Sequence, residues 1–243
     1  MGMHEMIHFF RQMSGKLDSA LYAGIQGQTD PRSISFMRQL QKDLKKKNSL
    51  DATLEQLEVV VFDLETTGFS PETGDRPISI GAIKMTGSQV EAEQTFYSLI
   101  NSKTPIPPSI SELTNIRDED LLNAPDAKDV LLQFYKFIGS RILIAHHAIH
   151  EKSFMQKLNR DYLRIGFDHR IIDTSFLIRL SDPHFKPLSL EDICSQCGIA
   201  VSGRHHALSD AKMTAMLWSH YLKKAQELGF STLRDVYEHL ARL

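Results

Sequence analysis

The sequence has little of what several classes of protein need. Only two of its 243 residues are cysteine, too few for a disulfide-stapled scaffold. Lys and Arg number 28 against 30 Asp and Glu, and this formal net charge of -2 excludes a polycation that coats nucleic acid. No apolar run approaches the length of a membrane-spanning helix, and the first residues lack the pattern of a secretory signal. We therefore expect a cytoplasmic protein with reduced thiols.

What the sequence does contain is enough apolar residue, at 42%, to fill a core, which excludes disorder over the whole chain. Charge is uneven along it: residues 1–50 carry +4 and the remainder -6. A basic polar stretch at residues 45–48 marks the break, and apolar residues at helical spacing precede it over residues 33–47. We expect residues 1–56 to form a helical N-terminal extension of unknown role.

Beyond residue 57 the pattern changes to short apolar strands alternating with helices. This order predicts a mixed α/β sheet covered by helices. Ser189, followed three residues later by Asp192, resembles the start of a capped helix. Strands are predicted at residues 59–62, 78–85, 94–100, 142–145 and 170–172, and helices at 127–138, 151–163, 174–179, 189–196, 207–225 and 231–243.

Two carboxylates follow the first predicted strand. Strand side chains alternate, so Asp63 and Glu65 point to the same face at its end. Burying two neighbouring carboxylates is costly unless a divalent cation such as Mg²⁺ or Mn²⁺ binds them. Residues 66–68 then form a turn whose backbone N–H groups would face an anion. The alternative is a strand that ends in a solvated acidic turn.

Two further segments place acidic residues at helix starts. Glu151 begins a helix after the histidines at 146, 147 and 150, where it is either a functional carboxylate or an ordinary helix-start acid. The histidine cluster also raises the possibility of zinc. His205 lies in the loop before the longest predicted helix, with Asp210 in that helix's first turns. A histidine beside metal-binding carboxylates is a candidate general base.

Together the three segments resemble the DnaQ-like exonucleases of the DEDDh type, which include the proofreading subunit of bacterial DNA polymerase III. The first motif, Asp-x-Glu-Thr-Thr-Gly, is matched by residues 63–68. The second, His-Asn-Ala-x-Phe-Asp followed by x-x-Phe, is matched by residues 146–154, and the third, His-x-Ala-x-x-Asp-Ala, by residues 205–211. The resemblance covers residues 57–225, the predicted exonuclease domain, and leaves 226–243 as a C-terminal helix packed on it.

The resemblance implies a ribonuclease H-like fold and a metal-dependent 3′–5′ exonuclease that releases 5′-mononucleotides from single-stranded nucleic acid, with DNA favoured over RNA. His205 would take the proton from the attacking water. A polymerase or another replication or repair protein is the implied partner. Two divalent cations, Mg²⁺ or Mn²⁺, would be held by Asp63, Glu65, Glu151 and Asp210, and the substrate contacted by Thr66, Thr67, Gly68, Phe69 and His146. Core packing is the alternative for Phe69.

The match to the second motif is imperfect. Glu151 stands where the family has Asp, His147 where it has Asn, and His150 where it has Phe. A longer carboxylate side chain alters the geometry around an octahedral ion. A weakly active or inactive member that binds nucleic-acid ends or docks a polymerase is therefore a second hypothesis. A third is a zinc-binding adaptor built on Cys194 and Cys197, for which buried packing is the competing interpretation.

Overall fold

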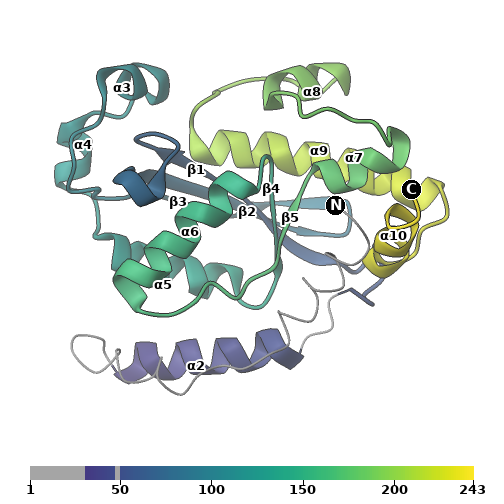
Figure 1. The fold of residues 1–243 in the computed structure, drawn as a ribbon, viewed down its shortest axis with the longest axis horizontal. Helices are drawn as coiled ribbons and strands as arrows, with labels where there is room; N and C mark the ends of the chain where they lie inside the picture. The colour runs from purple at the N-terminus through teal and green to yellow at the C-terminus, as the bar shows by residue number, and fades with distance from the viewer. Residues whose placement is uncertain (1–30, 47–49) are drawn as a thin grey trace.

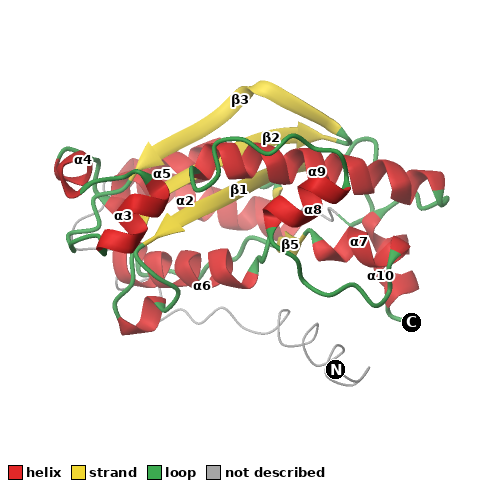
Figure 2. Ribbon diagram, turned by 90° about the horizontal axis from the view of Figure 1, so that it is seen from above, coloured by secondary structure: helices red, strands yellow, loops and turns green. Residues whose placement is uncertain are grey.

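A computed structural model describes residues 31–46 and 50–243, and the expectations for residues 1–30 and 47–49 lie outside these residues. The strands form one sheet in the order β3-β2-β1-β4-β5, with β3 at its outer edge (Figures 1 and 2). β1, β2 and β3 are antiparallel neighbours, whereas β4 and β5 run parallel to β1. The mixed sheet is thus confirmed, in the ribonuclease H-like arrangement that the resemblance implies. The strands are β1 (Glu58–Thr66), β2 (Pro77–Thr86), β3 (Gln89–Leu99), β4 (Ile142–Ala145) and β5 (Ile171–Asp173).

Helices cover both faces of this sheet. All seven predicted helices form, with ends that differ by a few residues, and Ser189 caps its helix by accepting the N–H of Asp192 at 3.1 Å. The prediction contained no helix at α3 or α4, which are seven and five residues long. The helices are α2 (Pro31–Lys46), α3 (Pro108–Thr114), α4 (Asp118–Leu122), α5 (Ala127–Ile138), α6 (Ile149–Leu158), α7 (Ser175–Ser181), α8 (Leu190–Gln196), α9 (Ala207–Glu227) and α10 (Leu233–Leu240), with a 3-10 turn, η2 (Pro71–Thr73), and a π-helical turn, η3 (Asn159–Leu163).

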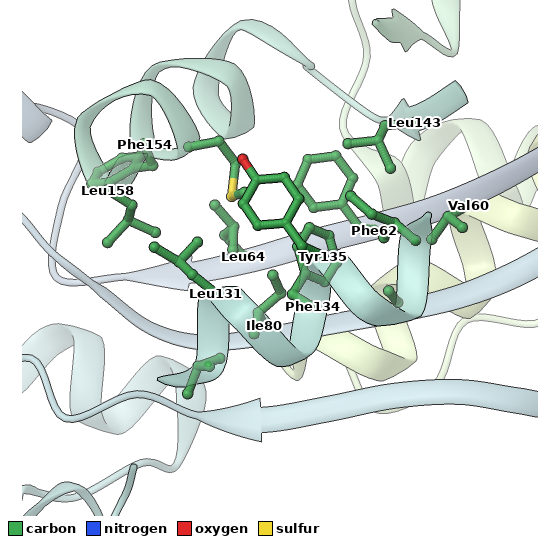
Figure 3. Packing of buried hydrophobic residues seen from close by; sticks show 14 of the residues in the cluster. Val60, Phe62, Leu64, Ile80, Leu131, Phe134, Tyr135, Leu143, Phe154 and Leu158 are labelled. Atoms are coloured by element: carbon green, nitrogen blue, oxygen red, sulfur yellow. The ribbon is translucent and has the colours of Figure 1, made fainter. Parts of the chain in front are cut away.

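The central strand β1 sends alternate side chains into two separate cores. Val60, Phe62 and Leu64 pack with residues of α5 and α6, as Figure 3 shows. Val59 and Val61 enter the opposite core, together with residues of α7, α9 and α10. Because both faces are covered, the strand reads in the sequence as a continuous apolar run rather than an alternating one.

The helix α2 packs on the first of these cores, along the outer side of α5 (Figure 1). Met37 and Leu40 are buried there, and the Gln41 side-chain amide donates a hydrogen bond to Asp168 at 3.2 Å. The division into an extension, a domain and a C-terminal helix stays a prediction. Within residues 31–46 and 50–243, no helix combines the length and apolar character needed to cross a membrane.

Candidate metal and active site

The two carboxylates of β1 lie on the face that α9 covers. Asp63 and Glu65 continue the alternation of Val59 and Val61, so they project from the same side of the strand. Asp63 is paired in register with Gly81 of β2, and Glu65 with Ser79. The prediction that both acids share one face at the strand's end is consistent with this register.

Gly81 allows α9 to approach these carboxylates. A Cβ atom at this position would lie 2.1 Å from the backbone nitrogen of Leu208 in the first turn of α9. No side chain fits into that gap, so glycine is required where the helix start lies against the sheet beside Asp63. The close approach brings Asp210 to the acidic residues of β1.

Asp63, Glu65 and Asp210 form a compact cluster. One carboxylate oxygen from each lies within 4.8 Å of the others. Burial, followed by the neighbouring negative charges, raises the pKa of Asp63 well above its usual range, and burial with the charge of Asp210 raises that of Glu65 to about 8. Asp210 Oδ1 is buried without a hydrogen-bond partner. An all-oxygen cluster with unsatisfied charge fits Mg²⁺ or Mn²⁺.

Glu151 lies in the first turn of α6, next to this cluster but outside the 4.8 Å group. Glu151 is 3% exposed, and its Oε2 atom has no hydrogen-bond partner. Burial, with the charges of Asp173 and Glu65, raises the pKa of Glu151 to about 8. A buried, unpaired carboxylate next to three others is better explained by a bound cation than by an ordinary helix-start acid. Its role as a metal ligand stays a prediction.

His205 precedes α9 in a strained turn. Its φ of +61° is in the left-handed region, which is uncommon for a residue other than glycine and costs conformational energy. This conformation directs the His205 backbone N–H toward Asp210 Oδ2, at 3.2 Å. The predicted base is therefore joined to the carboxylate cluster through its own backbone.

The turn after β1 is held by its own side chains. The Thr66 hydroxyl donates to the Gly68 carbonyl at 2.6 Å, and the Thr67 hydroxyl donates to Asp75 at 3.2 Å. The Thr67 N–H donates to the Arg76 carbonyl at 2.9 Å, which removes it from the N–H groups expected to face an anion. A Cβ on Gly68 would lie 2.4 Å from the Asp75 carboxylate, so a larger residue here would displace the side chain that closes the turn.

Phe69 leaves this turn and projects from the protein. It is 85% exposed, which excludes the alternative of core packing. Its ring meets that of His150, from the first turn of α6, edge to face with centroids 5.7 Å apart. The Phe69 ring is thus accessible to solvent just beyond the end of the strand that carries Asp63 and Glu65.

His146 has both ring nitrogens engaged within the protein. Nδ1 lies 2.8 Å from the Thr174 hydroxyl, and Nε2 lies 2.9 Å from the Leu188 carbonyl oxygen. Burial lowers the pKa of His146 and favours the neutral ring. The side chain therefore joins the end of β4 to the segments before α7 and α8, and its predicted contact with substrate is untested.

Several residues of the site gave no recognisable sequence signal. Arg204 forms an ion pair with Asp210, and Tyr97 of β3 stacks on His206 with ring centroids 4.5 Å apart. Asp173 accepts the backbone N–H groups of Ala148 and Ser175, which fixes the start of α6 against β5. Gly81 had a signal that the sequence analysis did not use, since a glycine inside an apolar strand indicates a close approach.

The two cysteines lie in an apolar cluster. Cys194 is fully buried in an apolar cluster, and the Cys197 thiol donates toward the Tyr221 hydroxyl at 3.7 Å. Burial raises the pKa of the Cys194 thiol to about 11. In the described part of the chain, neither cysteine belongs to a group of three or more residues placed to ligate one ion. This geometry favours the packing interpretation over a zinc-binding adaptor.

Comparison with known proteins gives consistent matches. The family model for RNase T, described as Exonuclease, matches residues 60–218. DNA polymerase III subunit epsilon of Aquifex aeolicus is 32% identical over 208 residues, covering 85% of this chain and 98% of that protein. DNA polymerase III PolC-type of Bacillus subtilis is 33% identical over 196 residues, which cover 80% of this chain but only 13% of the much longer relative. The structure of E. coli exonuclease I in complex with a dT13 oligonucleotide has a similar fold, with a TM-score of 0.58 and 15% identity, over 71% of this chain and 42% of that one.

Proposed function

Because this chain belongs to the RNase T exonuclease family, as a DnaQ-like 3′–5′ exonuclease domain, we propose that it hydrolyses the terminal phosphodiester of single-stranded DNA and releases 5′-mononucleotides. The observation that carries the proposal is the convergence of Asp63, Glu65 and Asp210 to within 4.8 Å. Two motifs that are far apart in the sequence supply these residues and the adjacent His205, and the remaining motif supplies Glu151 beside them. All of these residues lie within residues 60–218, which the family model matches.

The side chains divide the work of hydrolysis. Carboxylate oxygens of Asp63, Glu65 and Asp210, with Glu151 beside them, would hold two divalent cations, which when bound neutralise phosphate charge and activate the attacking water. His205 accepts the proton of that water, a role suited to imidazole because it changes protonation near neutral pH. The strained turn at His205 keeps it beside Asp210.

Exposed groups at the end of β1 would receive the substrate. The Phe69 ring offers a face on which the terminal base stacks, and stacking of this kind tolerates any base. The closed turn at Thr66–Gly68 keeps Phe69 in place, since both threonine hydroxyls are bonded within the turn or to Asp75. His146 acts behind this surface, by fixing the end of β4.

Single-stranded DNA is the favoured substrate for two reasons. The similarly folded exonuclease I is known in complex with a dT13 oligonucleotide, and the relatives of highest identity named above are DNA polymerase III proteins. A net charge of -2 suits an enzyme that grips a few nucleotides rather than a long duplex. We further propose that the chain works in DNA replication or repair beside a polymerase.

The direct test is digestion of a 5′-labelled single strand with Mg²⁺ or Mn²⁺. We expect a ladder of products shortened from the 3′ end, and no ladder with chelator or with Asp63→Ala. The same strand made as RNA should be degraded more slowly. If neither ion supports a ladder, the proposal is wrong. Retained binding of 3′ ends without cleavage would then favour the second hypothesis, an end-binding module, for which the position of Glu151 outside the 4.8 Å group is the supporting observation.

A further inference from the structure

The Arg204 side chain contacts the carboxylate cluster through Asp210. Its Nη1 pairs with Asp210 Oδ2, and the side chains of Arg204 and Asp210 are 22% and 6% exposed. The same oxygen accepts the His205 N–H at 3.2 Å. Two donors therefore converge on one oxygen of Asp210.

The other oxygen of Asp210 has no such partner. Oδ1 is buried and makes no hydrogen bond, while Asp210 belongs to the 4.8 Å group with Asp63 and Glu65. Hydrogen bonds to one oxygen of a ligating carboxylate fix the direction of the other and are a frequent means of orienting metal ligands. We infer that Arg204 is a positioning residue, which holds Asp210 by Oδ2 so that Oδ1 faces the divalent cation. This inference rests on the proposed metal-dependent function.

The backbone around Arg204 is shaped for this contact. Gly203 and His205, on either side of it, both have left-handed φ values, +62° and +61°. Within this turn, the Arg204 side chain and the His205 N–H reach the same carboxylate oxygen. Glycine adopts this conformation without strain, whereas at His205 it costs energy and persists only where surrounding contacts hold it.

A second role for Arg204 would have the opposite consequence. A guanidinium this close to three carboxylates is also a cation that competes with a metal ion for them. As an anchor, Arg204 increases metal affinity; as a competitor, it decreases it. The geometry favours the anchor, because Arg204 contacts the oxygen that His205 already uses and leaves Oδ1 unoccupied.

The sign of the effect on metal affinity distinguishes these roles. Mn²⁺ binding to the chelator-treated full chain is measured by calorimetry and by loss of the electron paramagnetic resonance signal of free Mn²⁺. The proteins compared are wild type, Arg204→Met, Arg204→Lys and Arg234→Met. We expect Arg204→Met to bind Mn²⁺ about 10- to 100-fold more weakly, as is typical when the partner of a ligand is removed. Arg204→Lys, which keeps a donor, should recover part of this loss. Arg234, paired with Asp51 beside α10, is the matched control and should leave affinity unchanged.

Each result has a defined meaning. Equal or tighter Mn²⁺ binding by Arg204→Met overturns the inference. If Arg204→Met does not fold, Arg204→Ala, which also removes the donor, is measured in its place, and wild-type affinity in that variant overturns the inference as well. If wild type itself binds no Mn²⁺, the proposed function fails first, and this outcome is distinct from a wild type that binds while Arg204→Met binds equally.

Discussion

The two faces of β1 serve opposite purposes. On the face toward α5 and α6, Val60, Phe62 and Leu64 are buried in an apolar core. On the face toward α9, the apolar residues give way to Asp63 and Glu65, whose pKa values are raised by burial and by neighbouring acids. Burying carboxylates costs free energy that an apolar side chain would not. One face therefore supplies stability, and the end of the other gives up stability, which the proposed binding of cations would explain. Substitutions at the adjacent residues Phe62 and Asp63 should therefore affect stability and cleavage separately.

The largest effect is expected on the apolar face. Phe62→Ala removes a side chain that is 1% exposed and packs against Phe134 with ring centroids 5.7 Å apart. We expect it to lower the free energy of unfolding by about 3–5 kcal/mol, measured by urea denaturation in chelator. The folded fraction should keep its rate of DNA cleavage at low temperature. A stable but inactive Phe62→Ala protein would contradict the division between the faces.

The next effect is expected one residue later, on the acidic face. Asp63→Asn keeps the size of the side chain and removes one of the repelling charges. Cleavage should fall by more than about 100-fold, since losing a ligand costs at least as much as losing a ligand's partner. The free energy of unfolding in chelator should stay the same or rise. Destabilisation like that of Phe62→Ala would show that Asp63 is needed for folding.

A pH titration tests the same contrast without substitution. In the metal-free protein Glu65 and Glu151 have pKa values of about 8, against 4.5 for an unperturbed glutamate. Between these values the folded state holds protons that the unfolded state has released, so stability decreases as pH rises, by about 1.4 kcal/mol per pH unit for each proton. Saturating Mn²⁺ should reduce this slope, because bound cations replace the protons. In chelator, Glu65→Gln should also reduce the slope of stability against pH. An unchanged slope in that variant would contradict the raised pKa of Glu65.

The sequence predicted the features of this contrast that depend on local patterns. It did not predict those that depend on contacts between separate segments of the chain. The period of two along β1 was enough to place Asp63 and Glu65 on one face, and apolar runs were enough to find five strands. Only the family resemblance predicted that Asp210 lies beside these two residues, since no local pattern indicates that α9 begins next to β2. Arg204 lies in the loop before α9, where no periodic pattern exists, and pairs with Asp210. Tyr97 stacks on His206, which is more than a hundred residues away in the sequence, so no local pattern indicates the contact. The exposure of Phe69 depends on the turn closed by Asp75, which the alternation of the strand does not encode.

The smallest effect is expected at Phe69, the exposed end of the acidic face. Because its side chain is 85% exposed, Phe69→Ala should leave the unfolding midpoint unchanged. Loss of one stacked base should raise KM for single-stranded DNA by about fivefold, equivalent to about 1 kcal/mol, with kcat nearly unaffected. Leu228→Ala is the control, since Leu228 is 58% exposed just beyond the end of α9 opposite to Asp210. Equal KM values for the two variants would show that Phe69 does not contact the substrate, and the acidic face would then bind DNA through its phosphates alone.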